Sequence, residues 1–189
     1  MVAGASGLVG LELVARLTRT PAYGRVIALT RRALQLEHPR LVEAPARFDA
    51  LDGVLAPLLP RSTVDAYCCL GTTIRSAGSQ QAFRHVDHDL VIAFARWAAS
   101  VPVSRLVVIS ALGADAKSRV FYNRVKGQTE NDLRAVAGSS LVLLRPGLLD
   151  GPRTEWRWGE SLALAMTRPV RTWLPASLRP VAVQDVAQS

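Results

Sequence analysis

The stretch MVAGASGLVGLELVARL, residues 1–17, decides the fold expected for this chain. Gly4, Gly7 and Gly10 lie between a short apolar segment and a segment whose apolar residues follow helical spacing. In a strand–turn–helix unit of this kind, the first glycine allows a tight turn, the second lets a phosphate approach the backbone, and the third lets the helix pack closely on the sheet. The N–H groups at the helix N-terminus attract an anion. The opening therefore predicts a dinucleotide-binding turn.

Length and composition are typical of a single globular domain. The chain has 189 residues, of which 49% are hydrophobic and 20% charged. No apolar run reaches the roughly 18 residues of a membrane span, and the stretch before Glu12 has no basic leader, so we expect neither a membrane span nor a signal peptide. The adjacent Cys68 and Cys69 are poor disulfide partners, which suggests buried thiols in a reducing cytoplasm.

The net charge of +8 raises the question of a nucleic-acid partner. The arginines are scattered, with an adjacent pair at Arg31 and Arg32, and no basic stripe is interleaved with aromatic residues. Such a distribution is typical of a solvated basic surface, so we expect no nucleic-acid partner.

Apolar runs alternate with longer amphipathic stretches, which predicts an α/β fold with a doubly wound, mostly parallel sheet and helices on both faces. The expected strands are Met1–Ala3, Val26–Leu29, Leu41–Ala44, Val64–Leu70, Leu106–Ser110 and Leu141–Leu144. The expected helices are Leu8–Thr18, Gln80–Ala99 and Asn123–Val136.

The alternation stops after Pro146. We expect residues 1–189 to form one domain, with 147–189 as a small substrate-side appendage that holds one helix, Glu160–Thr167. Both ends look clipped, because only three residues precede the glycine turn and the final PVAVQDVAQS resembles a strand followed by the first turn of a helix.

The second strand bears on cofactor choice. RVIALTRR ends in Thr30, Arg31 and Arg32, where an NAD-specific site places an acid that holds the ribose 2′-hydroxyl. A guanidinium pairs with a 2′-phosphate instead. This favours NADP(H) over NAD(H), the alternative being that the two arginines only begin a solvated loop.

Tyr122 and Lys126 stand four residues apart, on one face of an expected helix, and Ser110 ends an expected strand. A phenol is a weak acid with an ordinary pKa near 10, and a nearby ammonium favours its ionised form. A serine hydroxyl can donate to a carbonyl oxygen as negative charge develops there. The three residue types suit hydride transfer to a carbonyl, whereas the plain alternative is a surface tyrosine beside a lysine.

These motifs together resemble a known family. GASGLVG, the Ser110, Tyr122 and Lys126 set, and the Pro146–Gly147 pair resemble the atypical branch of the short-chain dehydrogenases/reductases. YCCLGTTIRSAGSQQAFRHVDHDLV and FYNRVKGQTENDL are similar to segments of the Tat-interacting-protein oxidoreductase subfamily and its bacterial relatives. The resemblance covers essentially the whole chain and implies an NAD(P)-binding Rossmann fold.

The resemblance also implies roles for individual residues. Ser110, Tyr122 and Lys126 would be catalytic, with Lys126 also holding the nicotinamide ribose. The expected cofactor-binding residues are Gly4, Ser6, Gly7, Leu8, Gly10, Arg31, Arg32, Leu70, Gly71, Thr72, Lys126, Pro146, Gly147 and Leu148. Two departures from the family stand out: Ala111 replaces a frequent second serine, and Arg47 replaces an acid expected near the adenine.

Two functions fit these residues. The first is NADPH-dependent reduction of a small carbonyl substrate, and the second is non-catalytic NADP(H) binding by a regulatory or scaffold protein. His85 and His88 could approach a metal, but no third ligand is evident, so we expect no metal site. The sequence leaves open whether the protein is a monomer or a dimer.

Overall fold

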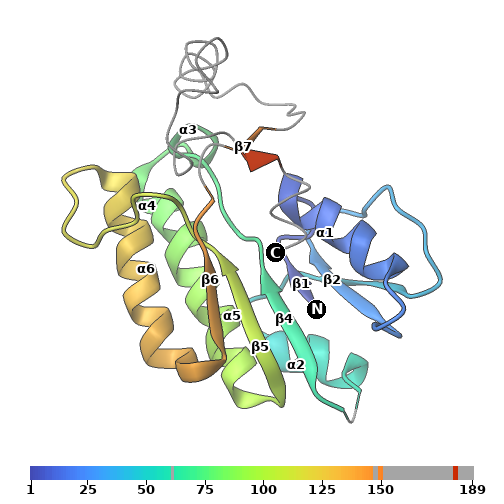
Figure 1. Ribbon diagram of the computed structural model, residues 1–189. Helices are drawn as coiled ribbons and strands as arrows, with labels where there is room; N and C mark the ends of the chain where they lie inside the picture. The colour runs from blue at the N-terminus through green and yellow to red at the C-terminus, as the bar shows by residue number, and fades with distance from the viewer. Residues whose placement is uncertain (61, 147–148, 151–180, 183–189) are drawn as a thin grey trace.

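The computed structural model describes residues 1–60, 62–146, 149–150 and 181–182. A parallel six-stranded sheet in the order β3-β2-β1-β4-β5-β6 forms its centre (Figure 1). The strands are β1 Val2–Ala3, β2 Val26–Thr30, β3 Leu41–Pro45, β4 Val64–Cys68, β5 Val103–Ile109 and β6 Leu141–Leu144. A separate parallel pair joins β7, Leu149–Asp150, to β8, Val181–Ala182. The expected α/β doubly wound fold is confirmed.

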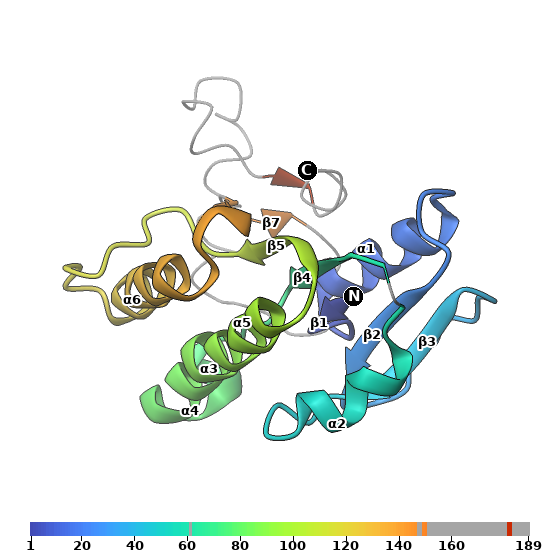
Figure 2. The ribbon, with the colours of Figure 1, turned by 90° about the horizontal axis from the view of Figure 1, so that it is seen from below.

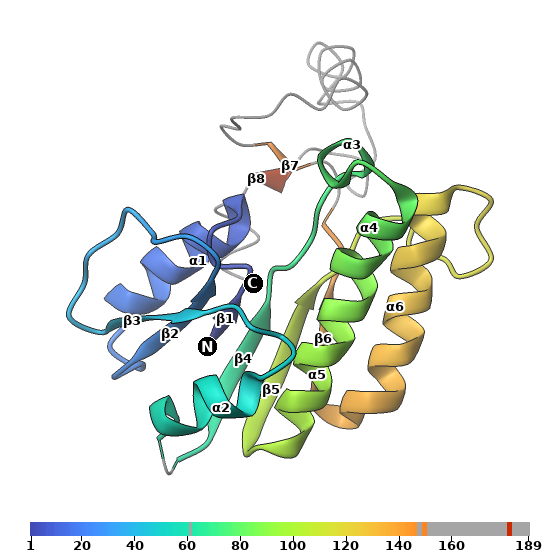
Figure 3. The same ribbon diagram turned by 180° about the vertical axis from the view of Figure 1, so that it is seen from behind.

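Helices lie on both faces of the sheet, as Figure 2 shows from below and Figure 3 from behind. On one face lies α1, and on the other lie α2, α5 and α6. The helices are α1 Leu8–Arg19, α2 Leu51–Leu55, α3 Ile74–Ala77, α4 Gln80–Arg84, α5 Leu90–Ser100 and α6 Phe121–Ala137, with short 3₁₀ turns at Ala56–Leu58 and Gly138–Ser140.

Alternation along the strands divides the core in two. Val2, Val26 and Ala28 pack with Leu13 and Val14 of α1. Ala3, Ile27 and Leu29, which are next to them in the strands, point to the opposite face. There they join a larger cluster with Leu55 of α2 and with Phe94 and Trp97 of α5. Because both faces are covered, the strands read as continuous apolar runs, which is why the sequence predicts them well.

The expected helix Gln80–Ala99 is interrupted. Between α4 and α5, His85–Asp89 forms a π-helical segment, which adds an extra residue to the turn. π-Helical segments are rare in proteins, and those that occur are often at functional sites. The hydrophobic period does not report this irregularity, and α3, whose N-terminus is capped by the Thr73 hydroxyl, is also absent from the sequence-based prediction.

The appendage lies mostly outside the described residues, including the expected helix Glu160–Thr167. None of the helices in the described ranges combines the length and apolar character that a membrane crossing requires.

Candidate functional site

The glycine turn connects β1 to the N-terminus of α1, between β2 and β4 in the sheet. Gly4 has a φ of 75°, and a Cβ on it would lie 2.7 Å from the carbonyl carbon of Cys69. A Cβ on Gly10 would lie 2.2 Å from the Gly4 carbonyl oxygen, so α1 approaches the turn as closely as a glycine permits. Ser6 and Gly7 are exposed at the N-terminus of α1 and Leu8 is half-buried, which leaves the turn open to an anionic ligand.

Arg31 and Arg32 follow β2 on the same edge of the sheet, and both are exposed. The Thr30 hydroxyl donates to the Arg32 carbonyl and accepts from the Arg32 N–H at 3.3 Å, which fixes the backbone just after the strand. The two arginines therefore start from a defined position beside the glycine turn, with side chains accessible to a phosphate.

The segment after β4, which includes Gly71 and Thr72, lies against Asp87, and Asp87 contacts the catalytic candidate Lys126. The Thr72 N–H donates to Asp87 Oδ2 at 2.8 Å. A Cβ on Gly71 would lie 3.5 Å from Asp87 Oδ1 and 3.9 Å from Lys126 Nζ, so the Gly71 backbone lies against both side chains. Of the residues expected on the adenosine and ribose side, Gly71 thus lies next to Lys126 and Thr72 contacts Asp87. Leu70 packs at the margin of the larger core cluster.

Lys126 and Asp87 form a buried ion pair. Lys126 Nζ lies 2.8 Å from Asp87 Oδ1, and the side chains are 7% and 1% exposed. Burial alone would lower the pKa of the Lys126 ammonium, but the charges of Asp87 and Tyr122 and the hydrogen bond to Asp87 outweigh it and raise that pKa above its ordinary value. Lys126 is therefore a fixed cation at neutral pH.

Tyr122 lies one helical turn before Lys126 on α6 and is half-buried. Its ring packs against Phe83 of α4 at a centroid distance of 5.5 Å, and Phe83 also contacts Phe121 at 5.7 Å. These contacts hold the phenol ring in place while part of the side chain remains accessible.

Ser110 follows β5 and is buried. Its hydroxyl donates to Glu130 Oε1 at 2.6 Å, and Glu130 stands one helical turn after Lys126 on α6. The Ser110–Glu130 hydrogen bond thus joins the carboxyl end of β5 to α6, the helix that carries Tyr122 and Lys126. This is the edge of the sheet at which parallel α/β folds bind ligands.

Two acidic residues of this site were not assigned a role from the sequence. Asp87 occupies the buried stripe of Phe83, Val91 and Phe94, where a charged residue is itself a signal. Glu130 ends the K-G-x-x-E segment that contributes to the family resemblance. In both cases the partners come from distant parts of the chain, so spacing alone could not reveal the contacts.

The remaining candidates are less informative. The Pro146 carbonyl accepts from the Leu112 N–H at 3.0 Å, which ties the chain after β6 to the loop after β5, while Gly147 and Leu148 lie outside the described residues. His88 lies between Asp89 and Asp132, at 2.7 and 2.8 Å. No group of three or more metal-ligating side chains occurs in the described ranges.

Cys68 is buried as expected, whereas Cys69 is half-buried. Burial raises the pKa of Cys68 to about 12 and raises that of Cys69 further, so neither is a nucleophile at neutral pH.

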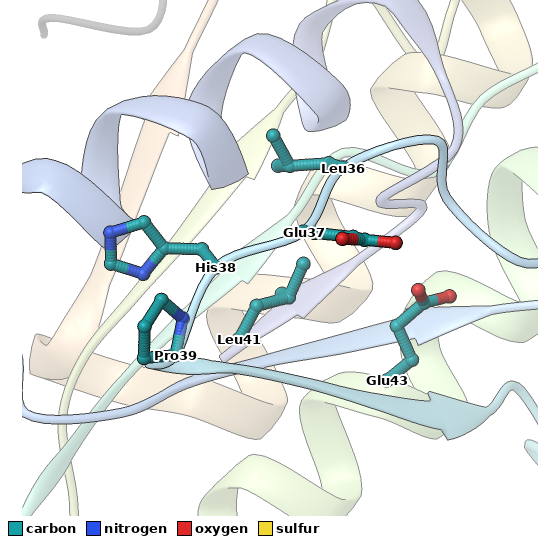
Figure 4. Close-up of a pocket in the computed structure, with 6 residues that line it drawn as sticks. All are labelled: Leu36, Glu37, His38, Pro39, Leu41 and Glu43. Atoms are coloured by element: carbon teal, nitrogen blue, oxygen red, sulfur yellow. The ribbon is translucent and has the colours of Figure 1, made fainter.

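A surface hollow lies elsewhere, between the segment that joins β2 to β3 and the edge strand β3 (Figure 4). His38, Pro39 and Leu41 place it towards the amino end of β3, whereas Ser110 follows the carboxyl end of β5. The hollow is therefore separate from the candidate site.

Comparison with known proteins gives the family. No family model matches the chain. The chain is 33% identical over 176 residues to the mitochondrial protein FMP52 of Eremothecium gossypii, covering 90% of this chain and 75% of that relative. It is 33% identical over 165 residues to protein HTATIP2 of Rattus norvegicus, covering 86% and 67%. The chain is an atypical short-chain dehydrogenase/reductase. The resemblance to the Tat-interacting-protein subfamily is confirmed.

Solved structures support the fold of this short-chain dehydrogenase/reductase. A GalE-like L-threonine dehydrogenase from Cupriavidus necator superposes with a TM-score of 0.72 at 16% identity, covering 99% of this chain and 69% of the other. A UDP-glucose 4-epimerase from Thermotoga maritima gives 0.71 at 15% identity, covering 99% and 70%. At such low identity the likeness concerns the fold alone.

The comparisons correct one expectation. The cytoplasmic location expected from the sequence is wrong, because the FMP52 relatives are named as mitochondrial proteins. The expectation depended on two unpaired cysteines. Free thiols indicate a reducing environment, but they do not distinguish one reducing compartment from another.

Proposed function

We propose that this chain is an NADP(H)-dependent oxidoreductase that reduces a small carbonyl compound. The observation that supports this most strongly is the buried Lys126–Asp87 ion pair one helical turn from Tyr122. A cation fixed beside an accessible phenol suits proton transfer to a substrate, and a pure cofactor-binding protein has no need of it.

The residues around the glycine turn fit a dinucleotide. The close packing of Gly10 on Gly4 sets the N-terminus of α1 beside the turn, where Ser6, Gly7 and Leu8 would contact a pyrophosphate. The Gly7 N–H donates to the Gly4 carbonyl at 3.0 Å, so Gly7 would contribute its lack of a side chain. Arg31, with Arg32, would pair with the 2′-phosphate. The segment Leu70–Thr72 would line the adenosine and ribose side.

The nicotinamide side has its own contacts in this proposal. Lys126 would hold the nicotinamide ribose, and Pro146, Gly147 and Leu148 would border the nicotinamide. When bound, NADPH supplies the hydride.

The protein itself contributes the proton. Tyr122 gives its phenolic proton to the substrate oxygen as negative charge develops there. Lys126 stays charged and stabilises the phenolate that remains. Ser110 orients the substrate oxygen. The second candidate, a non-catalytic NADP(H)-binding regulator, uses the same cofactor contacts but assigns no task to Tyr122.

Cofactor preference is tested by calorimetry with NADPH and NADH. We expect NADPH to bind at least several-fold more tightly, roughly the effect of one added charge contact. Arg31→Asp should narrow or invert the preference, because it replaces an attractive charge with a repulsive one. Arg96→Asp, an equal charge change at an exposed position on α5, is the matched control and should leave the preference intact. Equal affinities of the wild type for the two cofactors would rule out the assignment of Arg31.

A further inference from the structure

Three buried polar side chains lie within about one turn of α6: Lys126, Thr129 and Glu130. Glu130 accepts from Ser110 at 2.6 Å and from Arg145 through both carboxylate oxygens. Burial alone would raise the pKa of this carboxyl, but the hydrogen bonds from Arg145 and Ser110 outweigh burial and lower it. Thr129 has no part in the proposed reaction, although it is 4% exposed and a buried hydroxyl costs free energy unless it finds an acceptor.

The Thr129 hydroxyl lies between two backbone carbonyls. It is 2.8 Å from the Val125 carbonyl oxygen and 3.1 Å from the Asp87 carbonyl oxygen, and its single proton is shared between them. The Val125 contact stays within α6, since that carbonyl is one helical turn before Thr129. The Asp87 contact instead joins α6 to the π-helical segment His85–Asp89.

The π-helical segment decides where the Asp87 carboxylate lies. The Leu90 N–H donates to the His85 carbonyl, five residues earlier, so this turn contains one more residue than an α-helical turn. Return to a regular α-helix would rotate α4 relative to α5 by about 100°, the rotation of one residue. The Asp87 carboxylate contacts Lys126 Nζ and the Thr72 N–H, each at 2.8 Å. A rotation of that size would separate it from at least one of these partners.

Two contacts besides the ion pair tie the π-helical segment to α6. On the exposed side, His88 Nε2 lies 2.8 Å from Asp132 Oδ2, and Asp132 is 56% exposed, so water and salt weaken this pair. On the buried side is the hydrogen bond from Thr129 to the Asp87 carbonyl. Removal of a buried donor costs more, because its acceptor is left without a partner in a low-dielectric environment. The buried contact is therefore the stronger of the two.

We propose that Thr129 is a positioning residue for Lys126, whose hydroxyl holds the π-helical segment where the Asp87 carboxylate contacts the Lys126 ammonium. Thr129 acts through Asp87 and touches neither substrate nor cofactor. The inference rests on the proposed function, in which Lys126 holds the nicotinamide ribose and stabilises the Tyr122 phenolate. It deepens that function by naming the residue that keeps this cation in place.

The first test measures the protection of Lys126 without cofactor or substrate. Lys117 and Lys126 are the two lysines of the chain, and the exposed Lys117 is an internal reference. Brief labelling with acetic anhydride and mass spectrometry of peptides give the rate at Lys126 relative to Lys117. We expect this ratio to rise roughly threefold to tenfold in Thr129→Val, which keeps the shape of the side chain but lacks the hydroxyl, the effect of one hydrogen bond. Thr129→Ser keeps the hydroxyl and should keep the wild-type ratio.

The matched control is Asp132→Asn, which removes the exposed contact between the same two elements and should keep the wild-type ratio. In an Asp87→Asn background, Thr129→Val should add nothing, because Thr129 acts through the Asp87 carboxylate.

Three results would overturn the proposal. The first is a wild-type ratio in Thr129→Val. The second is a larger rise in Thr129→Ser than in Thr129→Val, which is expected if Thr129 only fills space with its methyl group. The third is a rise in Asp132→Asn, or a further rise in the Asp87→Asn background, as large as that of Thr129→Val in the wild type.

The second measurement is NADPH affinity by calorimetry. We expect Thr129→Val to weaken NADPH binding roughly threefold to tenfold, because Lys126 is less firmly held, and Thr129→Ser to bind like the wild type. If the labelling results are as expected but NADPH binding is unchanged in Thr129→Val, the ribose contact of Lys126 in the proposed function is wrong, and the positioning of Lys126 by Thr129 stands.

Discussion

Gly10→Ala is a direct test of the glycine turn. A Cβ at this position would lie 2.2 Å from the Gly4 carbonyl oxygen, 2.9 Å from the Gly4 carbonyl carbon and 3.0 Å from the Ala5 Cα. Ordinary contact begins at 3.4 Å, so the helix must move by about 1.2 Å, the difference between 3.4 and 2.2 Å. All three neighbours are backbone atoms, so no side-chain rotation can relieve the clash.

Overpacking of this kind costs roughly 1–3 kcal/mol. For a chain of this size, that corresponds to a fall in Tm of roughly 2–12 °C. Thermal melts followed by circular dichroism measure it, and calorimetry with NADPH should show weaker binding, because α1 and its N–H groups move away from the turn.

Gly53→Ala is the matched control. Gly53 lies in α2, and no heavy atom lies within 4 Å of an added Cβ. Alanine is the better helix former by about 1 kcal/mol, so this variant should melt at or above the wild-type temperature. If Gly10→Ala melts with the wild type and binds NADPH equally well, the close approach of α1 to the turn is refuted.

Two further variants test the buried charges. Asp87→Asn keeps an acceptor for the Thr72 N–H but leaves Lys126 as an unpaired buried cation, so we expect the free energy of unfolding in urea to fall by roughly 3–5 kcal/mol. The control is Asp49→Asn, which breaks an exposed ion pair and should lower it by under about 1 kcal/mol. Equal losses for the two variants would contradict the role of the buried pair. The lowered pKa of Glu130 means that its stabilising effect is present above the ordinary value of 4.5 and is lost as the pH falls through the folded-state value. The Tm should therefore fall more steeply from pH 6 to 3 for the wild type than for Glu130→Gln. If the two proteins give parallel curves, the Glu130 carboxyl is not the source of this pH dependence.

Much of the fold follows from the sequence. Leu141–Leu144 matches β6 at both ends, and the other predicted strands of the main sheet lie within a few residues of those observed. Strands buried on both faces form short apolar runs bounded by loops, which makes them easy to recognise. β4 ends at Cys68, two residues earlier than predicted, because the apolar run continues into the loop after the strand.

The site was only partly predictable. The Tyr122 and Lys126 pair follows from helical spacing, because both residues lie on one helix. The partners of Lys126 and Ser110 do not follow from helical spacing. Asp87 lies 39 residues before Lys126 (residue 87 to residue 126), and its position depends on a π-helical segment that the hydrophobic pattern does not predict. Long-range contacts between buried charges require the folded chain.

The central claim is that Tyr122 donates a proton during NADPH-dependent reduction. The most direct test follows NADPH oxidation with a panel of carbonyl compounds for the wild type, Tyr122→Phe and the control Tyr67→Phe, whose hydroxyl contacts Tyr23 away from the site. We expect Tyr122→Phe to bind NADPH almost normally and to lose roughly a hundredfold or more in turnover, while Tyr67→Phe retains it. Full activity of Tyr122→Phe on a compound that the wild type reduces would contradict the account.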